Sequence, residues 1–225
     1  MNNSNNNIYI GFDFSMNKPA ATIYFNKHVY FYFWPLNMTK PQREAFSKSG
    51  IRVTDRNLPS IKTKETDSSQ LTLIHTIRST ELANMIIKDI DELIESFNLS
   101  DDDYDLYVCS EGLSMASKGD ATLNLATYKG VLLSKIYEHY PNLKRLFTYA
   151  PNTLKSTAGC AVKALSKDKI NMIKSFMKEN INSPFKTSLI DGTLKAETSY
   201  YPGVDDICDS YWAFKTMIKK ENLPY

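Results

Sequence analysis

Closely spaced apolar residues dominate the first 34 positions of the chain and predict strands. The segment 8–14, IYIGFDF, is rich in β-branched and aromatic residues, which is typical of a buried strand. Two further apolar runs, 20–26 and 28–34, are separated by Lys27 alone, and this spacing predicts a tight antiparallel meander. The polar, Asn-rich residues 1–7 are expected to form a disordered tail.

The hydrophobic pattern changes after the third run. Residues 35–72 carry Pro, Lys, Ser and Thr with little periodicity, and because this is long for a structureless connection, we interpret it as a functional or mobile insertion. Apolar side chains then recur at spacings of three and four over 76–97, as in an amphipathic helix. Short apolar runs also predict strands at 104–111 and 145–150, and helical periodicity of the apolar residues predicts helices at 121–139, 166–180 and 204–220.

These elements describe a single α/β domain. Three meandering strands followed by helix, strand, helix, strand and helix predict a mixed five-stranded sheet with helices on both faces. The domain is expected to span residues 8–221, including the insertion at 35–72. The composition agrees, since 225 residues with 42% apolar and 23% charged residues are ordinary for a globular domain with a sizeable core.

Several classes of protein are excluded by what the sequence lacks. No apolar run approaches the roughly 18 residues of a membrane span, and the N-terminus lacks the basic-then-apolar pattern of a signal peptide. The cysteines, Cys109, Cys160 and Cys208, form no CxxC pair, and their odd number fits reduced thiols in a cytoplasmic setting. A structural zinc site is not expected beside only three His, and apolar neighbours indicate that Cys109 and Cys208 pack in the core.

Charge is distributed unevenly along the chain, although the formal net charge is only +2. Residues 76–111 hold two basic against ten acidic residues, a net of −8. Residues 144–178 hold eight basic residues against Asp168, a net of +7. Such a basic segment can form a phosphate-binding face while the whole molecule stays near neutral, and a solvated helix face explains the same charges equally well.

Two carboxylates stand where apolar strands end. Asp13 lies in the most apolar segment of the N-terminal half, and burying it is costly unless it is paired or holds a metal. An Asp that caps a turn at the strand end is the alternative. Glu111 repeats the pattern at the end of the second apolar strand. In open α/β sheets ligands collect beyond the carboxyl ends of strands, so the two side chains can face one crevice if their strands are neighbours.

Acidic residues also open the predicted C-terminal helix. Asp206 and Asp209 are three positions apart, so a helix places them on one face about one turn from each other. Like charges at this spacing repel unless a cation lies between them, whereas Asp205 can cap the helix N-terminus. Four carboxylates on three segments, without a His or Cys cluster, indicate Mg²⁺ or Mn²⁺ rather than zinc. Two such ions about 4 Å apart can activate a water and stabilise the leaving oxygen of a phosphodiester.

Taken in order, these motifs resemble the RuvC family of Holliday-junction resolvases, which belongs to the ribonuclease H-like superfamily. The segment 8–23 looks like the family's first strand with its first metal-binding Asp. The segment 111–138 is similar to the stretch in which a catalytic Glu ends a strand and a helix with a Gly-Val pair follows, here Gly130 and Val131. The family's Tyr-x-Pro…Lys…Gly block with its next helix, and its closing helix with two acids three apart, have similar counterparts at 149–159, 167–173 and 205–214.

The resemblance implies a ribonuclease H-like fold and a site for two Mg²⁺ ions, for which Mn²⁺ can substitute. The metal ligands that it implies are Asp13, Glu111, Asp206 and Asp209. It also implies a catalytic role for Lys155 near the scissile phosphate, with Lys155, Lys163 and Lys167 contacting the DNA backbone. Ser114 and Met115 stand where bacterial members carry a base-stacking aromatic residue, so they too are expected to face the DNA.

The implied activity is that of a metal-dependent, structure-selective DNA endonuclease that resolves four-way junctions. Resolution needs two symmetric nicks, so a two-fold homodimer is implied. The helix at 76–97 or 121–139 can supply the dimer surface, although an apolar stripe more commonly faces the core. The long insertion at 35–72, an altered turn near Gly159 and a composition rich in Asn, Lys and Ile favour a bacteriophage or other viral branch, acting in the cytoplasm of a bacterial host.

Other functions stay open. The same four acids suit a ribonuclease H-like nuclease that acts on RNA–DNA hybrids, flaps or other branched replication and packaging intermediates, and dimerisation would favour the junction. A catalytically inactive binder of DNA structures is disfavoured because all four acidic positions are filled. A phosphotransferase of the actin and sugar-kinase type opens with a similar strand and hairpin. That class needs a second nucleotide-binding domain and a Gly-rich loop, which one domain with eight glycines does not offer.

Overall fold

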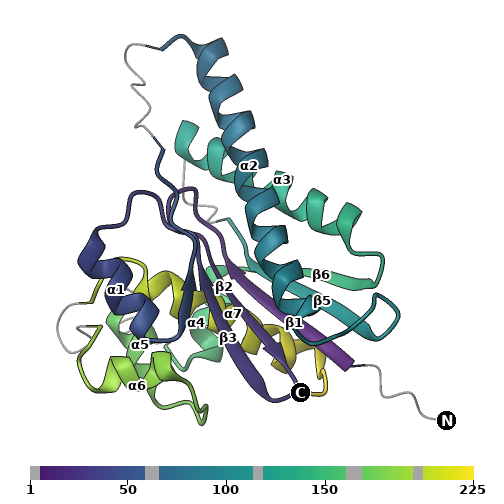
Figure 1. Cartoon of the computed structure of the whole chain (residues 1–225), viewed down its shortest axis with the longest axis vertical. Coiled ribbons are helices and arrows are strands. Elements are labelled where there is room, and N and C mark those ends of the chain that lie inside the picture. Colours follow the sequence, from purple (N-terminus) through teal and green to yellow (C-terminus); the bar gives the residue numbers. More distant parts are fainter. Residues whose placement is uncertain (1–5, 59–65, 114–118, 161–168, 195–199) are drawn as a thin grey trace.

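A mixed sheet of six strands forms the centre of the fold, in the order β4-β3-β2-β1-β5-β6 (Figure 1). The structure is a computed structural model, and it describes residues 6–58, 66–113, 119–160, 169–194 and 200–225. The strands β1, β2 and β3 form an antiparallel meander, whereas β5 is parallel to β1, β6 to β5 and β4 to β3. The bounds of the strands are β1 Asn6–Asp13, β2 Ala20–Phe25, β3 His28–Phe33, β4 Ile51–Val53, β5 Tyr104–Glu111 and β6 Leu143–Tyr149.

Helices cover both faces of this sheet (Figure 1). The long helices α2 (Ser68–Glu95) and α3 (Asp120–His139) pack together on one face, and α7 (Val204–Glu221) lies along the other. Shorter helices contribute to the core on the α7 face, namely α1 Lys40–Lys48, α4 Pro151–Thr157, α5 Lys169–Met177 and α6 Pro184–Ile190. The expected class, a mixed α/β sheet with helices on both faces, is confirmed. No helix within the described ranges is both long and apolar enough to cross a membrane.

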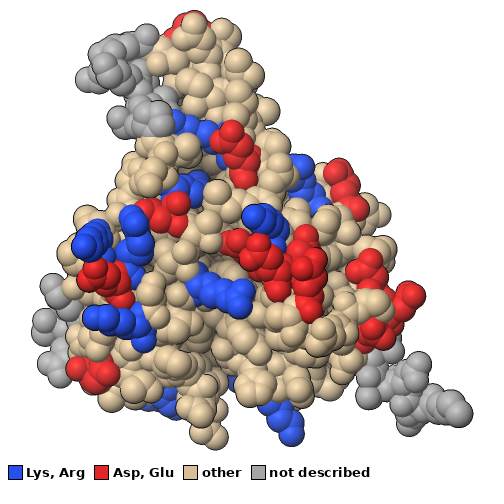
Figure 2. Space-filling view, in the orientation of Figure 1, with Lys and Arg blue, Asp and Glu red and all other residues tan. Residues whose placement is uncertain are grey.

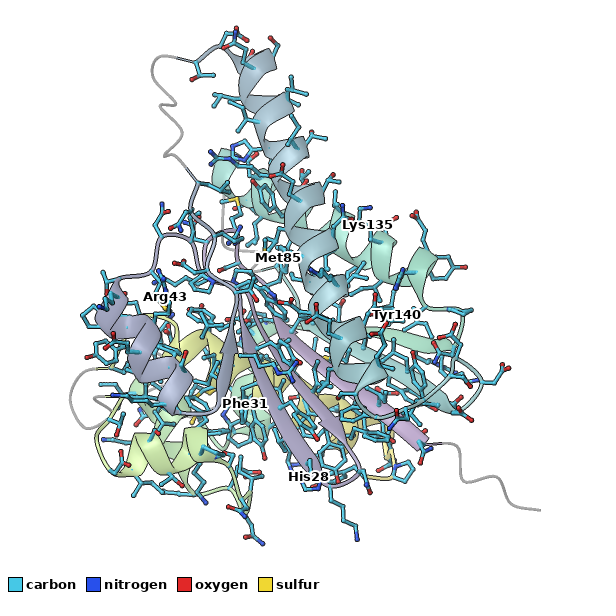
Figure 3. The ribbon with its side chains drawn as sticks, viewed as in Figure 1. His28, Phe31, Arg43, Met85, Lys135 and Tyr140 are labelled. Carbon is cyan, nitrogen blue, oxygen red and sulfur yellow. The ribbon has the colours of Figure 1, made fainter. Side chains whose placement is uncertain are left out.

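Alternate side chains of β1 enter two separate cores, which explains why this strand is apolar throughout. Ile10 and Phe12 pack in the core beneath α2 and α3, whereas Tyr9 packs in the core beneath α7. Side chains elsewhere divide in the same way (Figure 3): Phe31 of β3 belongs to the α7 core, and Met85 of α2 packs against the other. Odd-numbered positions of β1 therefore face α7, and Asp13 is the last of them.

The predicted number of five strands is wrong, because the sheet has a sixth strand inside the insertion. The three residues of β4 pair in parallel with the edge of β3, from Phe31 opposite Ile51 to Phe33 opposite Val53. A strand of three residues is too short to produce a period-two pattern in the sequence, so the pairing follows from the neighbouring edge and not from local preference.

The insertion at 35–72 is folded over most of its described length. It contains α1, β4 and the start of α2. An ion pair of 2.5 Å between Arg43 of α1 (labelled in Figure 3) and Asp55 ties the helix to the segment after β4. Phe46 of α1 is fully buried and stacks on Phe33 at a centroid distance of 5.3 Å. The described part of the insertion is therefore an ordered extension of the sheet and its α7 core.

Element boundaries differ from the prediction where a capping residue or a strand partner decides them. The helix expected from residue 76 begins at Ser68, because the carboxylate of Asp67 accepts hydrogen bonds from two backbone N–H groups of the first turn. The tail expected at 1–7 is shorter, since Asn6 and Asn7 pair with Tyr104 and Asp105 of β5.

The short helices were not predicted, and one expected helix lies partly outside the described residues. α4 and α6 each have only seven residues, and both begin at a proline, which is favourable in a first helical turn. The helix expected at 166–180 corresponds to α5, and residues 166–168 lie outside the described ranges.

The three cysteines are buried free thiols. Cys109 and Cys208 have no exposed surface, and Cys160 has 4%. The expectation that Cys109 and Cys208 pack in the core is confirmed.

Candidate active site

The ends of β1 and β5 bring two of the predicted acids together. These strands are parallel neighbours, and their register pairs Phe12 with Ser110. Asp13 and Glu111 follow directly, so their backbones lie on adjacent strands about 5 Å apart. Both are odd-numbered positions on strands whose other odd-numbered residues, such as Cys109, face the α7 core. The two carboxyl groups thus leave the same edge and the same face of the sheet, as expected for neighbouring strands.

Helix α7 passes directly over β1, and a glycine makes this approach possible. A Cβ atom at Gly11 would lie 2.4 Å from both the backbone oxygen of Ser210 and the backbone nitrogen of Phe214. The buried hydroxyls of Thr22 and Ser210 form a hydrogen bond of 2.8 Å nearby. The contact fixes the N-terminal half of α7 beside the end of β1. It is this half that carries Asp206 and Asp209.

The four acids form one electrostatic cluster, which we call the carboxylate cluster: Asp13, Glu111, Asp206 and Asp209. Burial raises the pKa of each of these carboxyl groups. For Asp13 the charges of the other three raise the pKa further. Hydrogen bonding with the Asp13 side chain lowers the pKa of Glu111 and of Asp206 and so offsets part of the rise.

Two lysines that the sequence analysis did not single out lie beside the cluster. Lys169, at the start of α5, forms an ion pair with Asp205, and its charge opposes the rise in the pKa of all four cluster acids. Asp205 is therefore a partner of Lys169 and not the cap of α7, whose N-cap is Gly203. Lys129 of α3 is only 9% exposed, and its ammonium donates a hydrogen bond to the backbone oxygen of Glu111.

A sequence signal for one of these lysines existed. Lys129 directly precedes the Gly-Val pair and lies between the apolar positions Leu125 and Leu132, where helical periodicity places a residue on the buried side. A charged residue at such a position needs a specific partner. For Lys169 no comparable signal exists, because its partner Asp205 is distant in the sequence.

The predicted DNA-contacting residues divide into one described position and four that are not described. Lys155 lies on α4, half-buried, and its positive charge counteracts the rise in the pKa of Glu111, so it lies on the cluster's side of the molecule. Ser114, Met115, Lys163 and Lys167 lie outside the described residues, and their DNA contacts stay predictions.

The chemistry of the carboxylate cluster fits a hard divalent cation. Carboxylate oxygens are the ligands that Mg²⁺ and Mn²⁺ prefer, and the described surroundings of the cluster hold neither a His nor an accessible thiolate. In the described ranges, no three or more His, Cys, Asp or Glu side chains are already arranged around a common point.

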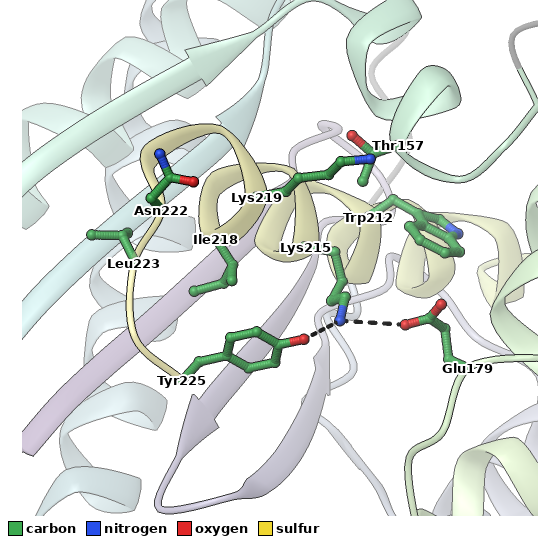
Figure 4. Close-up of a pocket in the computed structure, with 9 residues that line it drawn as sticks. All are labelled: Thr157, Glu179, Trp212, Lys215, Ile218, Lys219, Asn222, Leu223 and Tyr225. Carbon is green, nitrogen blue, oxygen red and sulfur yellow. Dashed lines mark hydrogen bonds and ion pairs between the residues drawn. The ribbon is translucent and has the colours of Figure 1, made fainter.

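A cavity lies at the opposite end of α7 and is separate from the carboxylate cluster (Figure 4). Its volume is about 520 Å³, and Lys215 crosses it, 3.5 Å from the carboxylate of Glu179 and 2.6 Å from the hydroxyl of Tyr225. Ile218, which also lines it, is nine residues after Asp209, about 13 Å along the helix axis. This cavity holds none of the four predicted acids.

The acidic segment expected from the sequence is visible on the surface. Figure 2 shows Asp and Glu side chains gathered over the C-terminal half of α2 and the loop before β5. These residues include Glu92, Glu95 and Asp101 to Asp103, which are exposed. This face is that of α2 and α3, whereas the carboxylate cluster belongs to the α7 side of the sheet.

The sheet consists of the antiparallel meander β1-β2-β3, with β4 at the β3 edge, and continues on its other side with the parallel strands β5 and β6. No protein-family model matches the sequence, and a comparison with curated proteins gives no significant match.

Solved structures that are similar to the chain include the following three. The first is RuvC of Thermus thermophilus, with 8% identity, a TM-score of 0.46, and 95% of this chain and 96% of that chain covered. The second is the yeast mitochondrial Holliday junction resolvase Ydc2, with 13% identity, a TM-score of 0.45, and coverage of 95% and 78%. The third is Thermus thermophilus RuvC in complex with a Holliday junction substrate, with 11% identity, a TM-score of 0.39, and coverage of 95% and 95%.

Proposed function

We propose that this chain is a divalent-metal-dependent endonuclease that cuts branched DNA, with the four-way junction as its substrate. The observation that carries the proposal is the electrostatic cluster of Asp13, Glu111, Asp206 and Asp209, drawn from β1, β5 and α7. Four buried carboxyl groups repel one another strongly when they are ionised, and this repulsion destabilises the fold. Such groups therefore cluster mainly at sites where their charge takes part in binding or catalysis.

In this proposal the four carboxylates hold the ions. Bound Mg²⁺ or Mn²⁺ supplies Lewis-acid stabilisation to the attacking water and to the departing 3′ oxygen. Lys155 orients the scissile phosphate from α4. Lys169, fixed by Asp205, offsets the negative charge of the cluster, so that a phosphodiester can approach. Backbone contacts of this kind position the DNA without reading its sequence.

The junction, as opposed to another branched substrate, is favoured by a homodimer with two cutting sites. The N-terminal half of α2 exposes Leu73 and Ile77 with 60% and 47% of their surface, and we propose this half of the helix as the dimer surface.

Flaps and RNA–DNA hybrids remain the alternative substrates within the same chemistry. A phosphotransferase is not supported, since the described ranges form one sheet and no second nucleotide-binding domain. The viral branch of the family stays a prediction from composition.

The decisive experiment compares substrates. The purified protein is incubated with four-way, three-way, flap, linear duplex and RNA–DNA substrates in Mg²⁺, Mn²⁺, Ca²⁺ or EDTA, and its mass in solution is measured by light scattering. We expect paired symmetric nicks in the four-way junction with Mg²⁺ or Mn²⁺, and a dimer mass. Cleavage confined to flaps or hybrids would select the alternative. Cleavage that persists in EDTA would refute the metal-dependent proposal.

Cation binding can also be tested without any substrate. Mn²⁺ at about 100 times its Kd should stabilise the folded chain by about 2.7 kcal/mol, which raises Tm by about 5–10 °C for a domain of this size. Asp209→Asn should remove most of this shift. Burial and the neighbouring carboxylates raise the pKa of Asp209 to about 8, so in EDTA above that pH the same variant should melt at a higher temperature than the wild type, because it removes a buried charge that the other acids repel. Differential scanning fluorimetry measures both effects, and an equal Mn²⁺ shift in the two proteins would argue against the site.

A further inference from the structure

A second, much smaller cavity lies near the carboxylate cluster, and we call it the Arg56 cavity. Its volume is about 60 Å³. Four separate segments line it: the loop after β1 with Met16, the insertion with Arg56, helix α2 with His75 and Arg78, and helix α3 with Tyr128. None of these residues belongs to the carboxylate cluster, and the resemblance assigns none of them a role.

Two covalent connections place the Arg56 cavity beside the cluster. Met16 follows Asp13 by three residues, a distance that an extended chain covers in about 10 Å. Tyr128 directly precedes Lys129, whose ammonium donates to the backbone oxygen of Glu111. The cavity is therefore one short loop away from Asp13, since Arg56 donates a hydrogen bond to the backbone oxygen of Met16.

The charge of Arg56 is held in place without being neutralised by its hydrogen-bond partners. Arg56 is 6% exposed, and its Nε donates to the backbone oxygen of Trp34 at 3.0 Å while Nη2 donates to that of Met16 at 2.8 Å. Carbonyl oxygens satisfy the donors but carry no net charge. The neighbouring carboxylate of Asp55 is ion-paired with Arg43 at 2.5 Å. Burial lowers the pKa of Arg56 to about 10, so the guanidinium stays charged at neutral pH.

The other polar residues of the cavity add positive charge and hydrogen-bond donors. Arg78 lies close enough to act electrostatically on both His75 and Tyr128. Nδ1 of His75 lies 3.3 Å from the hydroxyl of Tyr128. Glu81 also acts on Tyr128, but it is not among the residues that line the cavity. Among the described residues that line the cavity there are two guanidinium groups, an imidazole and a phenol, and no carboxylate. Such a cavity favours an anion.

We propose that the Arg56 cavity binds a single backbone phosphate of the nucleic-acid strand that the carboxylate cluster cleaves. Its volume equals that of about two water molecules in the liquid, which is room for the oxygens of a phosphodiester and too little for a nucleobase. The proposal rests on the proposed nuclease function and deepens it. It gives the insertion a role, because Arg56 ties the insertion to the loop after Asp13 and presents its charge to the strand.

The first test measures the salt dependence of DNA binding. In an Asp13→Asn background, which prevents cleavage, Arg78→Gln should weaken binding to a fluorescent four-way junction and lower the slope of log K against log salt by about 1. The matched control is Lys88→Gln, which removes one positive charge from the same helix at a residue paired with Glu92 at 3.7 Å. Arg78→Gln leaves both backbone hydrogen bonds of Arg56 intact, and a melting curve verifies its fold. Slopes that are equal for the two variants would overturn the proposal.

The second test locates the phosphate. Neutral methylphosphonate linkages replace the phosphates around the cleavage position one at a time, and affinities are measured for proteins with and without Arg78→Gln. At one position the neutral linkage should weaken binding to the parent protein but cause little further loss of affinity for the Arg78→Gln variant, since both changes remove the same contact. Effects that add at every position would refute a phosphate contact in this cavity.

The two proposals fail in distinguishable ways. The parent protein could bind single-stranded or duplex DNA but no four-way junction, and one position in that DNA could show the non-additive effect. This result would support the phosphate site in the Arg56 cavity and refute the junction as the substrate. If the protein binds no nucleic acid of any form, both are lost. Arg56→Lys is the supporting variant: it keeps the charge but loses the two-pronged hydrogen bonding, so its affinity should lie between those of the parent and Arg78→Gln.

Discussion

Replacing Asp13 with Asn is expected to lower the rate of junction cleavage by at least about 10²-fold, the loss typical for removing one group that stabilises a transition state. The carboxylate of Asp13 contacts both Glu111 and Asp206, so its loss disrupts the centre of the cluster. Binding of DNA should persist, because the basic residues are unchanged. Single-turnover cleavage in Mg²⁺ and fluorescence anisotropy, measured on the same junction, separate the two effects.

The matched control is Asp102→Asn. Asp102 is exposed in the loop before β5, so its replacement makes the same change of charge at a distance from the cluster. This variant should cleave at the wild-type rate. If the Asp13 variant cleaves as fast as the control, Asp13 does not belong to the reacting site.

Replacing Gly11 with Ala should destabilise the protein by about 3 kcal/mol or more, since overpacking of this kind usually costs 1–3 kcal/mol and here the added methyl meets backbone atoms. The new Cβ would lie 2.4 Å from the oxygen of Ser210 and from the nitrogen of Phe214, neither of which can rotate away. Helix α7 must shift, and it carries Asp206 and Asp209 with it. We therefore expect a Tm about 6–12 °C lower and, in the folded fraction, about 10²-fold slower cleavage.

The same substitution at Gly130 is expected to change the stability of the protein in the opposite direction. It is exposed in the middle of α3, and a Cβ there would meet no atom within 4 Å. Gly130→Ala should stabilise the protein by about 0.5–1 kcal/mol, because alanine restricts the unfolded chain and favours the helix. Thermal melts of the two variants side by side test the packing of α7 on β1. If Gly11→Ala melts like Gly130→Ala, that close approach is absent in solution.

The elements with strong periodicity were predictable, and those that depend on a distant partner were not. The predicted runs 20–26 and 28–34 contain β2 (Ala20–Phe25) and β3 (His28–Phe33), because their β-branched and aromatic side chains suit a two-sided sheet in any context. By contrast, β4 is three residues long and exists because the edge of β3 offers backbone groups to it. The early start of α2 depends on one capping side chain, Asp67, in a segment without apolar periodicity.

The carboxylate cluster shows the same division. Its four acids could be selected from the sequence, since each follows or interrupts an apolar element where an unpaired charge is costly. Lys169 could not, because its role depends on an ion pair with Asp205, which reaches α5 only through the packing of α7. Arg56 was hidden within an insertion that has no periodicity, and its significance lies in the backbone oxygens of Trp34 and Met16.

By itself the sequence indicated the four acids of the carboxylate cluster and the order of the long elements that carry them, because periodicity and the cost of a buried charge act over a few residues. Only the tertiary structure decided which of these residues meet. The pairing of β1 with β5 joins residues 98 positions apart, such as Phe12 and Ser110, and the passage of α7 over Gly11 joins residues 199 positions apart, Gly11 and Ser210. Such contacts depend on the summed packing of two cores, and no local pattern encodes them.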